Sequence, residues 1–170
     1  MTVLERLSAE GSLLFRDLVL KKECARWAEE LTSTLNGWRS LLPVHIFGPN
    51  PLYKNVEITD ARIVRILTGL ELSPIKTAYA TRYKPGDKLA RHSDAVHGHP
   101  RFVLLLRKPI CGGVLKIEDV NFDVDVGDAI LHDGKGFHEV SVIDDGERMS
   151  LLCEVIQSDA GLPKDLARDR

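Results

Sequence analysis

From residue 75 onward the chain is a succession of short segments rich in aliphatic, β-branched and aromatic residues. Seven such segments follow one another, namely IKTAYATRY, RFVLLLR, GGVLKIE, VNFDVDV, DAILHD, HEVSVI and RMSLLCEVIQ. Turn sequences such as PGD, KPICGG and VGD separate them, because glycine, proline and aspartate favour tight turns. Many short strands at this spacing predict a barrel or a jelly roll.

The first forty residues are instead typical of helices. Apolar residues recur there with the 3.6-residue period of one helix face, at Leu18, Cys24, Trp27, Ala28 and Leu31. Residues 43–57 are rich in proline, glycine and asparagine and predict an irregular connection. The stretch ITDARIVRILTG predicts a second helix, with Thr59 or Asp60 as its N-cap and Gly69 beyond its end.

A chain of 170 residues is most simply one domain with a full hydrophobic core. We expect a mainly helical support region over 1–72, a β core over 73–158 and a C-terminal tail over 159–170. The helices are expected to pack on one sheet of the barrel, which is an α+β arrangement. With 44% apolar and 28% charged residues, the composition is that of a folded globular protein.

Charge, apolar runs and cysteines exclude several classes of protein. A net charge of −2 provides no attraction for nucleic acid or acidic membranes, and no apolar run approaches the roughly 20 residues of a membrane span. The N-terminus lacks the long apolar stretch of a signal peptide. Three cysteines without CxxC spacing do not predict a disulfide framework. We therefore expect a cytoplasmic protein without membrane or nucleic-acid partners, whose oligomeric state stays open.

The segment YKPGDKLARHSD contains a histidine and an aspartate two positions apart. In a strand, side chains at i and i+2 point the same way, so His92 and Asp94 can face one point while Ser93 faces away. One imidazole and one carboxylate form half of a metal site. A second histidine from a distant strand would complete the two-histidine, one-carboxylate triad of Fe(II) enzymes. By itself the HxD motif also fits a surface loop with a capping aspartate.

Further motifs follow in a fixed order: GGVL at 112–115, GDAIL at 127–131, HEV at 138–140 and RMS at 148–150. Together with YKPGDKLARHSD, this series resembles the 2-oxoglutarate/Fe(II)-dependent oxygenases, particularly their prolyl-4-hydroxylase-like branch. The resemblance covers about half of the chain. It implies a double-stranded β-helix that uses Fe(II), with 2-oxoglutarate and O2 as co-substrates. The implied reaction is the hydroxylation of an unactivated C–H bond, with release of succinate and CO2.

The resemblance also implies roles for individual residues. The iron ligands would be His92, Asp94 and His138. Arg148 would pair with the C5 carboxylate of 2-oxoglutarate, and Ser150 and Tyr83 would add hydroxyl groups to the same co-substrate. A guanidinium is suited to this role because it binds a carboxylate through two parallel hydrogen bonds. Tyr83 fits almost equally well as an aromatic wall of the barrel, and Arg148 as a solvated arginine after a turn.

Other histidines compete for these roles. His132, in ILHDG, is a rival third ligand, but the HEV context and the interval to Arg148 favour His138. His97 and His99 alternate like a ligand pair. Their segment also contains glycine and proline, which is more typical of a loop near the mouth of an active site, where both could contact substrate.

Two other functions remain compatible with the sequence. The first is a cupin-like metal-binding barrel without 2-oxoglutarate chemistry, and the second is a non-catalytic binding domain. Nucleic-acid demethylation is disfavoured, because Glu154 stands where that branch has a second arginine. Halogenation is disfavoured too, because halogenating relatives lack the carboxylate that Asp94 supplies. The substrate, whether a small molecule, an amino acid or a peptidyl residue, is not identified by any motif.

Overall fold

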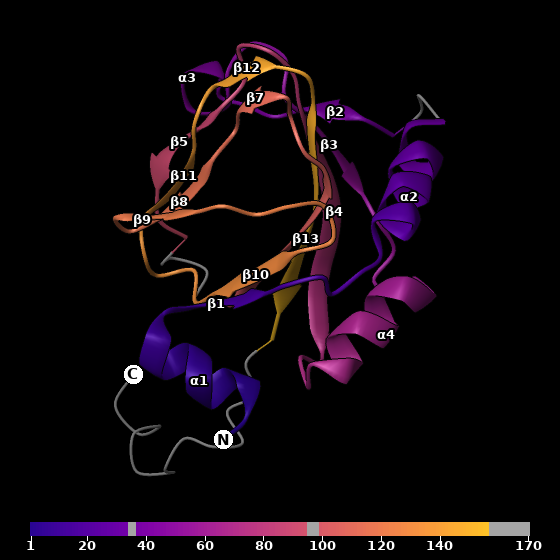
Figure 1. Cartoon of the computed structure of the whole chain (residues 1–170), viewed down its shortest axis with the longest axis vertical. Helices are drawn as coiled ribbons and strands as arrows, with labels where there is room; N and C mark the ends of the chain where they lie inside the picture. The colour runs from indigo at the N-terminus through magenta and orange to yellow at the C-terminus, as the bar shows by residue number, and fades with distance from the viewer. Residues whose placement is uncertain (34–36, 95–98, 157–170) are drawn as a thin grey trace.

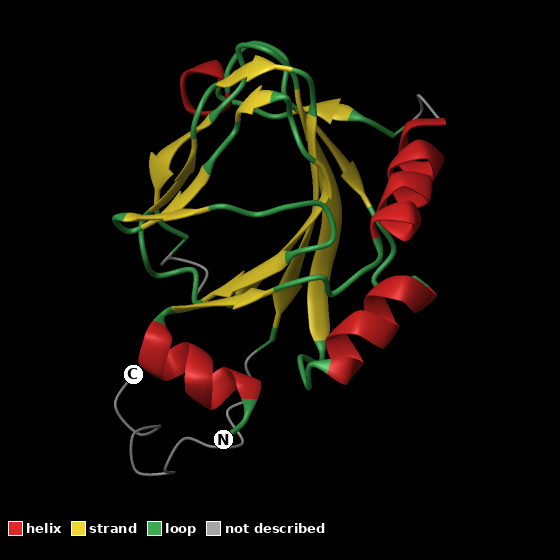
Figure 2. Ribbon diagram, viewed as in Figure 1, coloured by secondary structure: helices red, strands yellow, loops and turns green. Residues whose placement is uncertain are grey.

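Two antiparallel sheets face each other in the computed structural model of this chain, and helices cover the outer face of the larger sheet (Figure 1, Figure 2). The structure describes residues 1–33, 37–94 and 99–156. No helix in these ranges is long and apolar enough to cross a membrane.

The helices are α1 (Val3–Glu10), α2 (Lys21–Ser33), α3 (Val44–Phe47) and α4 (Ala61–Gly69). The larger sheet has the order β1-β10-β6-β13-β4-β3-β2, with bounds Ser12–Phe15, Ala129–His132, Arg101–Arg107, Arg148–Val155, Ile75–Tyr83, Leu52–Asn55 and Arg39–Ser40. The smaller sheet has the order β5-β11-β8-β9, with bounds Leu89–His92, His138–Val140, Leu115–Ile117 and Val120–Phe122. A third pair joins β12 (Ile143–Asp145) to β7 (Cys111–Gly112).

From β4 to β13 the chain passes repeatedly between the two large layers. Strands β4, β6, β10 and β13 belong to the larger sheet, while β5, β8, β9 and β11 belong to the smaller one. Each visit to one sheet is followed by a return to the other, which is the winding of a double-stranded β-helix. The predicted fold class is therefore confirmed.

The larger sheet is buried on both faces. Along β6, Phe102, Leu104 and Leu106 belong to the core that the sheet forms with helices α2 and α4, called the outer core below. Leu105 belongs to a second core, which lies between the sheets. Successive side chains of a strand point to opposite faces, so a strand covered on both sides needs apolar residues at successive positions. This explains why FVLLL is an unbroken apolar run.

Strand β13 shows the same alternation with different chemistry on its two faces. Met149 and Leu151 pack in the outer core beneath the helices. Arg148 and Ser150, which alternate with them along the strand, point between the sheets and are also buried. Polar residues at alternate positions of an otherwise apolar strand therefore mark the interior of the barrel.

The prediction of continuous helix near the N-terminus is wrong for residues 12–15. Gly11, in a left-handed conformation (φ 73°), ends α1, and its N–H donates to Leu7 O. The next four residues form β1, which pairs with β10 along one edge of the larger sheet. Leu13 is buried in the outer core from this strand. Pairing with a strand more than 100 residues away overrides the local helical pattern.

The connection predicted over 43–57 is only partly irregular. It contains the short helix α3 and strand β3, which pairs with β4 and extends the larger sheet. Helix α4 agrees with its prediction at the N-terminus, where the Asp60 side chain accepts from Arg62 N. At the other end, Gly69 is the last helical residue, and the C-cap is Leu70.

Candidate active site

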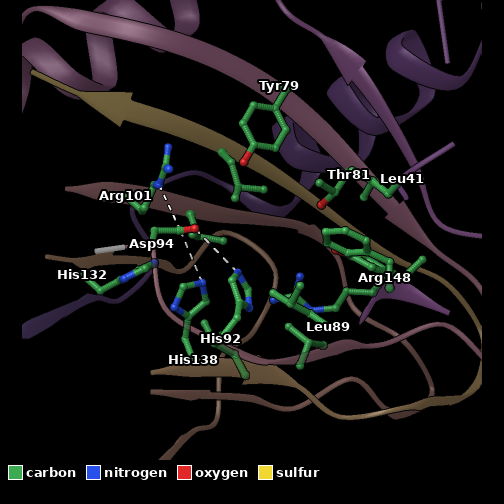
Figure 3. Close-up of a pocket in the computed structure, with 16 residues that line it drawn as sticks. Leu41, Tyr79, Thr81, Leu89, His92, Asp94, Arg101, His132, His138 and Arg148 are labelled. Atoms are coloured by element: carbon green, nitrogen blue, oxygen red, sulfur yellow. Dashed lines mark hydrogen bonds and ion pairs between the residues drawn. The ribbon is translucent and has the colours of Figure 1, made fainter. Parts of the chain in front are cut away.

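One cavity, of about 170 Å³, lies between the two sheets (Figure 3). Its polar side chains come from the inner faces of four strands of the larger sheet, from the ends of β5 and β11, and from the loop that follows β5. They are Tyr79, Thr81, Tyr83, His92, Asp94, Arg101, His132, His138 and Arg148. The cavity is therefore lined by most of the site residues predicted from the sequence, together with others that were not predicted.

His92 and His138 are neighbours because the strands that carry them pair in register. His92 ends β5, His138 begins β11, and the two are direct partners with ring centroids 4.2 Å apart. Asp94 follows β5 and places its Oδ1 3.7 Å from His92 Nε2 and its Oδ2 3.6 Å from His138 Nε2. All three ligand atoms lie within 4.8 Å of one another, so the group could hold a metal ion. Asp94 does so from a loop and not from the predicted strand.

The backbone sets the proton positions on both imidazoles. His92 Nδ1 lies 2.9 Å from Ala90 O, and His138 Nδ1 lies 3.3 Å from Gly136 O. A carbonyl oxygen can only accept, so each Nδ1 carries the proton, and each Nε2 presents its lone pair toward Asp94. Burial, assisted by the neighbouring His92, lowers the pKa of His138 and keeps that ring neutral. Two imidazoles and a carboxylate are ligands that suit a divalent transition metal.

His132, the rival ligand, lies in the same cavity but outside this group. Its ring centroid is 4.7 Å from that of His138, and its Nδ1 accepts from Gly134 N at 3.3 Å. Burial lowers the pKa of His132 to about 3, so its ring is neutral. The ring packs against that of His138. His97 lies outside the described residues. His99 is described, and its Nδ1 is buried without a hydrogen-bond partner.

Arg148 is a buried cation whose charge has no counterion in the described part of the chain. The residue is 3% exposed, its Nη1 donates to the Ser150 hydroxyl, and its Nε has no partner. Burial lowers the pKa of Arg148 to about 10, so the guanidinium still carries its charge at neutral pH. A buried charge without a partner is costly. In a cavity, such an arginine is therefore suited to an anionic ligand.

Gly113 explains why a glycine pair precedes β8. Its φ is +68°, and a Cβ there would lie 2.6 Å from Ile143 Cδ1 and 3.4 Å from Arg148 Cδ. A side chain at this position would collide with Ile143, and also with Pro109 Cγ at 2.9 Å, whereas 3.4 Å from Arg148 Cδ is an ordinary contact. The glycine thus allows the chain before β8 to pack closely against Ile143 and Pro109.

Strand β4 lines the cavity with three hydroxyl-bearing residues at alternate positions: Tyr79 and Thr81, which Figure 3 labels, and Tyr83. Tyr83 is the register partner of Arg148, and Thr81 is that of Ser150. Burial raises the pKa of Tyr83, so its phenol stays protonated. The Thr81 hydroxyl is buried and has no hydrogen-bond partner among the described residues. Thr81 was not predicted as a site residue, although its spacing from Tyr83 places both residues on one face of the strand.

Arg101 lies near the motifs in the sequence, but the sequence assigned it no role. It lies at the start of β6, is nearly buried, and contacts the carboxylates of Asp94 and Glu154. No motif marked it, because its contact with Asp94 depends on how distant strands pair.

Comparisons with known proteins agree with this geometry. A family model described as aspartyl/asparaginyl beta-hydroxylase matches residues 19–158. The search of curated proteins finds no match. A solved prolyl-4-hydroxylase from Pseudomonas putida is similar with a TM-score of 0.71 and 17% identity, over 91% of this chain and 97% of that chain.

Two further solved structures have the same fold. A 2OG-Fe(II) oxygenase family oxidoreductase from Burkholderia pseudomallei has a TM-score of 0.67 and 18% identity, over 88% of this chain and 87% of that one. A prolyl hydroxylase from Trichoplax adhaerens, in complex with a peptide fragment of hypoxia inducible factor, has a TM-score of 0.71 and 13% identity, over 91% and 87%. The resemblance read from the sequence motifs is thereby confirmed.

Proposed function

The chain belongs to the aspartyl/asparaginyl beta-hydroxylase family and is a 2-oxoglutarate- and Fe(II)-dependent oxygenase, and on this premise we propose how its cavity performs hydroxylation. The observation that carries the proposal is the buried, unpaired Arg148 guanidinium in the same cavity as the two histidines and the aspartate. A metal group alone would fit many metalloproteins. A metal group beside an unpaired buried cation fits an enzyme with an anionic co-substrate.

In this proposal the iron is held by His92, Asp94 and His138. Arg148 binds the distal carboxylate of 2-oxoglutarate through its free Nε and its terminal nitrogens. In this proposal the hydroxyl groups of Tyr83 and Thr81, which line the same cavity, and that of Ser150, which accepts from Arg148 Nη1, donate to that carboxylate. Charge-assisted hydrogen bonds of this kind are about twice as strong as neutral ones, and a dry cavity strengthens them further.

When bound, iron and 2-oxoglutarate supply the oxidising chemistry, in which O2 converts the co-substrate to succinate and CO2 and hydroxylates a C–H bond. The protein orients the reactants and excludes water. Leu89, Leu115 and Val140 form apolar walls of the same cavity. These walls limit side reactions with solvent and hold the co-substrate in one orientation.

A cupin-like metal-binding barrel is the principal alternative. Such a protein would share the barrel and the histidines but would have no use for a buried arginine in the cavity. The position and burial of Arg148 therefore favour the oxygenase. A non-catalytic binding domain is disfavoured as well, because it would not need a metal group in the same cavity as an arginine suited to an anion.

For the substrate we propose a small molecule, an amino acid or a peptidyl residue. A peptide is supported by the Trichoplax adhaerens neighbour, whose structure holds a peptide fragment. We also propose a cytoplasmic location, because Cys24, Cys111 and Cys153 are all free thiols, as expected in a reducing compartment.

Anaerobic addition of Fe(II) and 2-oxoglutarate tests the proposal, since the bound pair is expected to produce a weak visible charge-transfer band. The band should vanish in His92→Ala. The matched control is His45→Ala, which removes an exposed histidine of α3 and should leave the band unchanged. Absence of the band in the wild-type protein would contradict the proposal. The substrate class follows from a succinate-release screen of amino acids, peptides and small metabolites, with mass spectrometry for one added oxygen.

A further inference from the structure

Arg101 lies between the carboxylate of the metal group and a second buried carboxylate. Its Nε donates to Asp94 Oδ2 at 3.2 Å (Figure 3), and its Nη1 lies 2.5 Å from Glu154 Oε1. The side chains of Arg101 and Glu154 are only 9% and 8% exposed. Exposed ion pairs contribute little, but a desolvated pair with two good contacts holds its members in one geometry.

The larger sheet fixes this pair by its register. Arg101 is the direct partner of Glu154 across β6 and β13, and Glu154 is the partner of Thr77 across β13 and β4. The Thr77 hydroxyl donates to Glu154 Oε2 at 2.9 Å, and Lys76 Nζ lies 3.8 Å from the same oxygen. Both oxygens of Glu154 are thus engaged, which leaves the carboxylate little freedom to release Arg101.

Glu154 is ionised in this setting. Burial alone would raise its pKa, but the hydrogen bond from Thr77 and the charge of Arg101 hold the pKa below its ordinary value. Its negative charge therefore balances that of Arg101. An unbalanced guanidinium beside the metal group would repel a cation, whereas the pair orients Asp94 without adding net charge.

Asp94 needs an external support of this kind. His92 and His138 are each held on a strand, but Asp94 follows the last residue of β5. Its backbone N–H donates to Gly134 O at 3.0 Å, and this bond fixes the main chain only. The direct hydrogen bond that orients its carboxylate comes from Arg101.

We propose that Arg101 is a positioning residue that holds the Asp94 carboxylate toward His92 and His138, and that Glu154 fixes Arg101 for this purpose. The proposal rests on the proposed function, because it takes Asp94 as a metal ligand. It assigns the Arg101–Glu154 pair to metal binding and leaves 2-oxoglutarate recognition to Arg148.

Metal binding without turnover tests this assignment. The dissociation constant of Mn(II) is measured from the EPR signal of the free ion for wild type, Arg101→Gln and Arg101→Lys. Loss of a partner that orients a metal ligand typically costs about 10–100-fold in affinity, and we expect that loss in Arg101→Gln. Arg101→Lys retains a donor and a charge but not the planar fork, so it should recover part of the affinity.

Arg82→Gln is the matched control. Arg82 Nε donates to Glu147 Oε2 at 2.6 Å, so the variant also removes a partly buried arginine–carboxylate pair of the larger sheet, but one outside the cavity lining. Its Mn(II) affinity should equal that of wild type. With metal saturating, the concentration of 2-oxoglutarate for half-maximal binding should be unchanged in Arg101→Gln and strongly raised in Arg148→Met.

A folded Arg101→Gln protein that binds Mn(II) as tightly as wild type would overturn the positioning role, and so would an equal loss of affinity in Arg82→Gln. If Arg101→Gln does not fold, Glu154→Gln decides: weakened Mn(II) binding supports the role, and wild-type binding refutes it. Failure of the wild-type protein itself to bind Mn(II) would instead refute the proposed function.

Discussion

Asp128 and Arg148 are two of the buried charged residues of the larger sheet, and they differ in how many partners the described part of the chain gives them. Asp128, just before β10, accepts from Arg16 Nη1 at 2.7 Å and from the backbone N–H groups of Asp17 and Asp125 at 2.9 Å. Within the described residues, Arg148, at the start of β13, donates only to the Ser150 hydroxyl, and its Nε has no partner.

The pKa shifts of the two groups express the same difference. Burial alone would raise the pKa of Asp128, but the backbone N–H groups and Arg16 outweigh it and lower the pKa, which favours the charged form. Burial lowers the pKa of Arg148 to about 10, which disfavours the charged form. A buried charge that has its hydrogen-bond and ion-pair partners within the chain has a structural role. A buried charge that lacks such partners beside a cavity indicates a ligand of opposite charge.

The largest expected effect is that of Arg148→Met on the co-substrate. Two lost hydrogen bonds to a carboxylate, at about 1.5–3 kcal/mol each, should raise the KM for 2-oxoglutarate by roughly 100-fold or more. The unfolding free energy in urea, measured without iron or 2-oxoglutarate, should be unchanged or higher, because an uncompensated charge is removed.

Arg107→Met is the control for these two effects, the raised KM and the unchanged stability. Arg107 pairs with Glu147 at 2.6 Å and is 38% exposed, so its loss should alter neither the KM for 2-oxoglutarate nor the stability by much. If Arg148→Met were destabilised and kept a normal KM, Arg148 would resemble Asp128, and the comparison would fail.

Asp128→Asn should show the opposite behaviour. The amide cannot accept all three hydrogen bonds and carries no charge for Arg16, so we expect a loss of about 2 kcal/mol in unfolding free energy. The KM for 2-oxoglutarate should stay within about twofold, since the lost bonds lie outside the cavity. Urea denaturation and succinate release measure the two quantities. Asp123→Asn, whose side chain is 93% exposed, is the control and should leave both unchanged.

The stability difference between wild type and Asp128→Asn should also depend on pH. The folded-state pKa of Asp128 lies below the unfolded value, so the carboxylate stabilises the fold above the unfolded pKa. That contribution is lost as pH falls through the folded pKa. Unfolding free energies of the two proteins should therefore converge below about pH 4. A difference that persists into strong acid would show that packing, not charge, explains the effect of Asp128→Asn.

The smallest effect concerns Thr81, whose hydroxyl is buried without a partner. Thr81→Val should raise the KM for 2-oxoglutarate by roughly 5-fold, the loss of one hydrogen bond of about 1 kcal/mol. Stability without ligands should not fall, because an unsatisfied hydroxyl leaves the core. Thr68→Val, on the exposed face of α4, should leave the KM unchanged. Equal KM values for wild type and Thr81→Val would remove Thr81 from the co-substrate site.

The inward orientation of Arg148 and Ser150 could be predicted from the sequence. In RMSLLCEV the polar residues Arg148 and Ser150 alternate with apolar ones, and the structure places them on the inner face of β13. The i, i+2 rule depends only on local backbone geometry, so it needs no knowledge of neighbouring strands. The same rule applied to YATRY would have added Thr81 to Tyr83.

Other features depended on contacts between distant segments. Residues 12–15 were predicted as helix because their apolar pattern fits either structure, and only pairing with β10 decides for β1. Asp94 was expected on a strand, but β5 ends at His92. Arg101 carried no motif, since its partners Asp94 and Glu154 are set by sheet register and loop position.

The order of the motifs, the alternation within each strand and the types of side chain were determined by the sequence alone, and they indicated the family, the fold and the chemistry. The tertiary structure decided which of the candidate histidines lie next to Asp94 and which arginine orients its carboxylate. It also decided which buried charges have hydrogen-bond and ion-pair partners within the chain. The physical reason is range: backbone geometry acts over two to four residues, whereas strand register and loop closure depend on the packing of the whole domain.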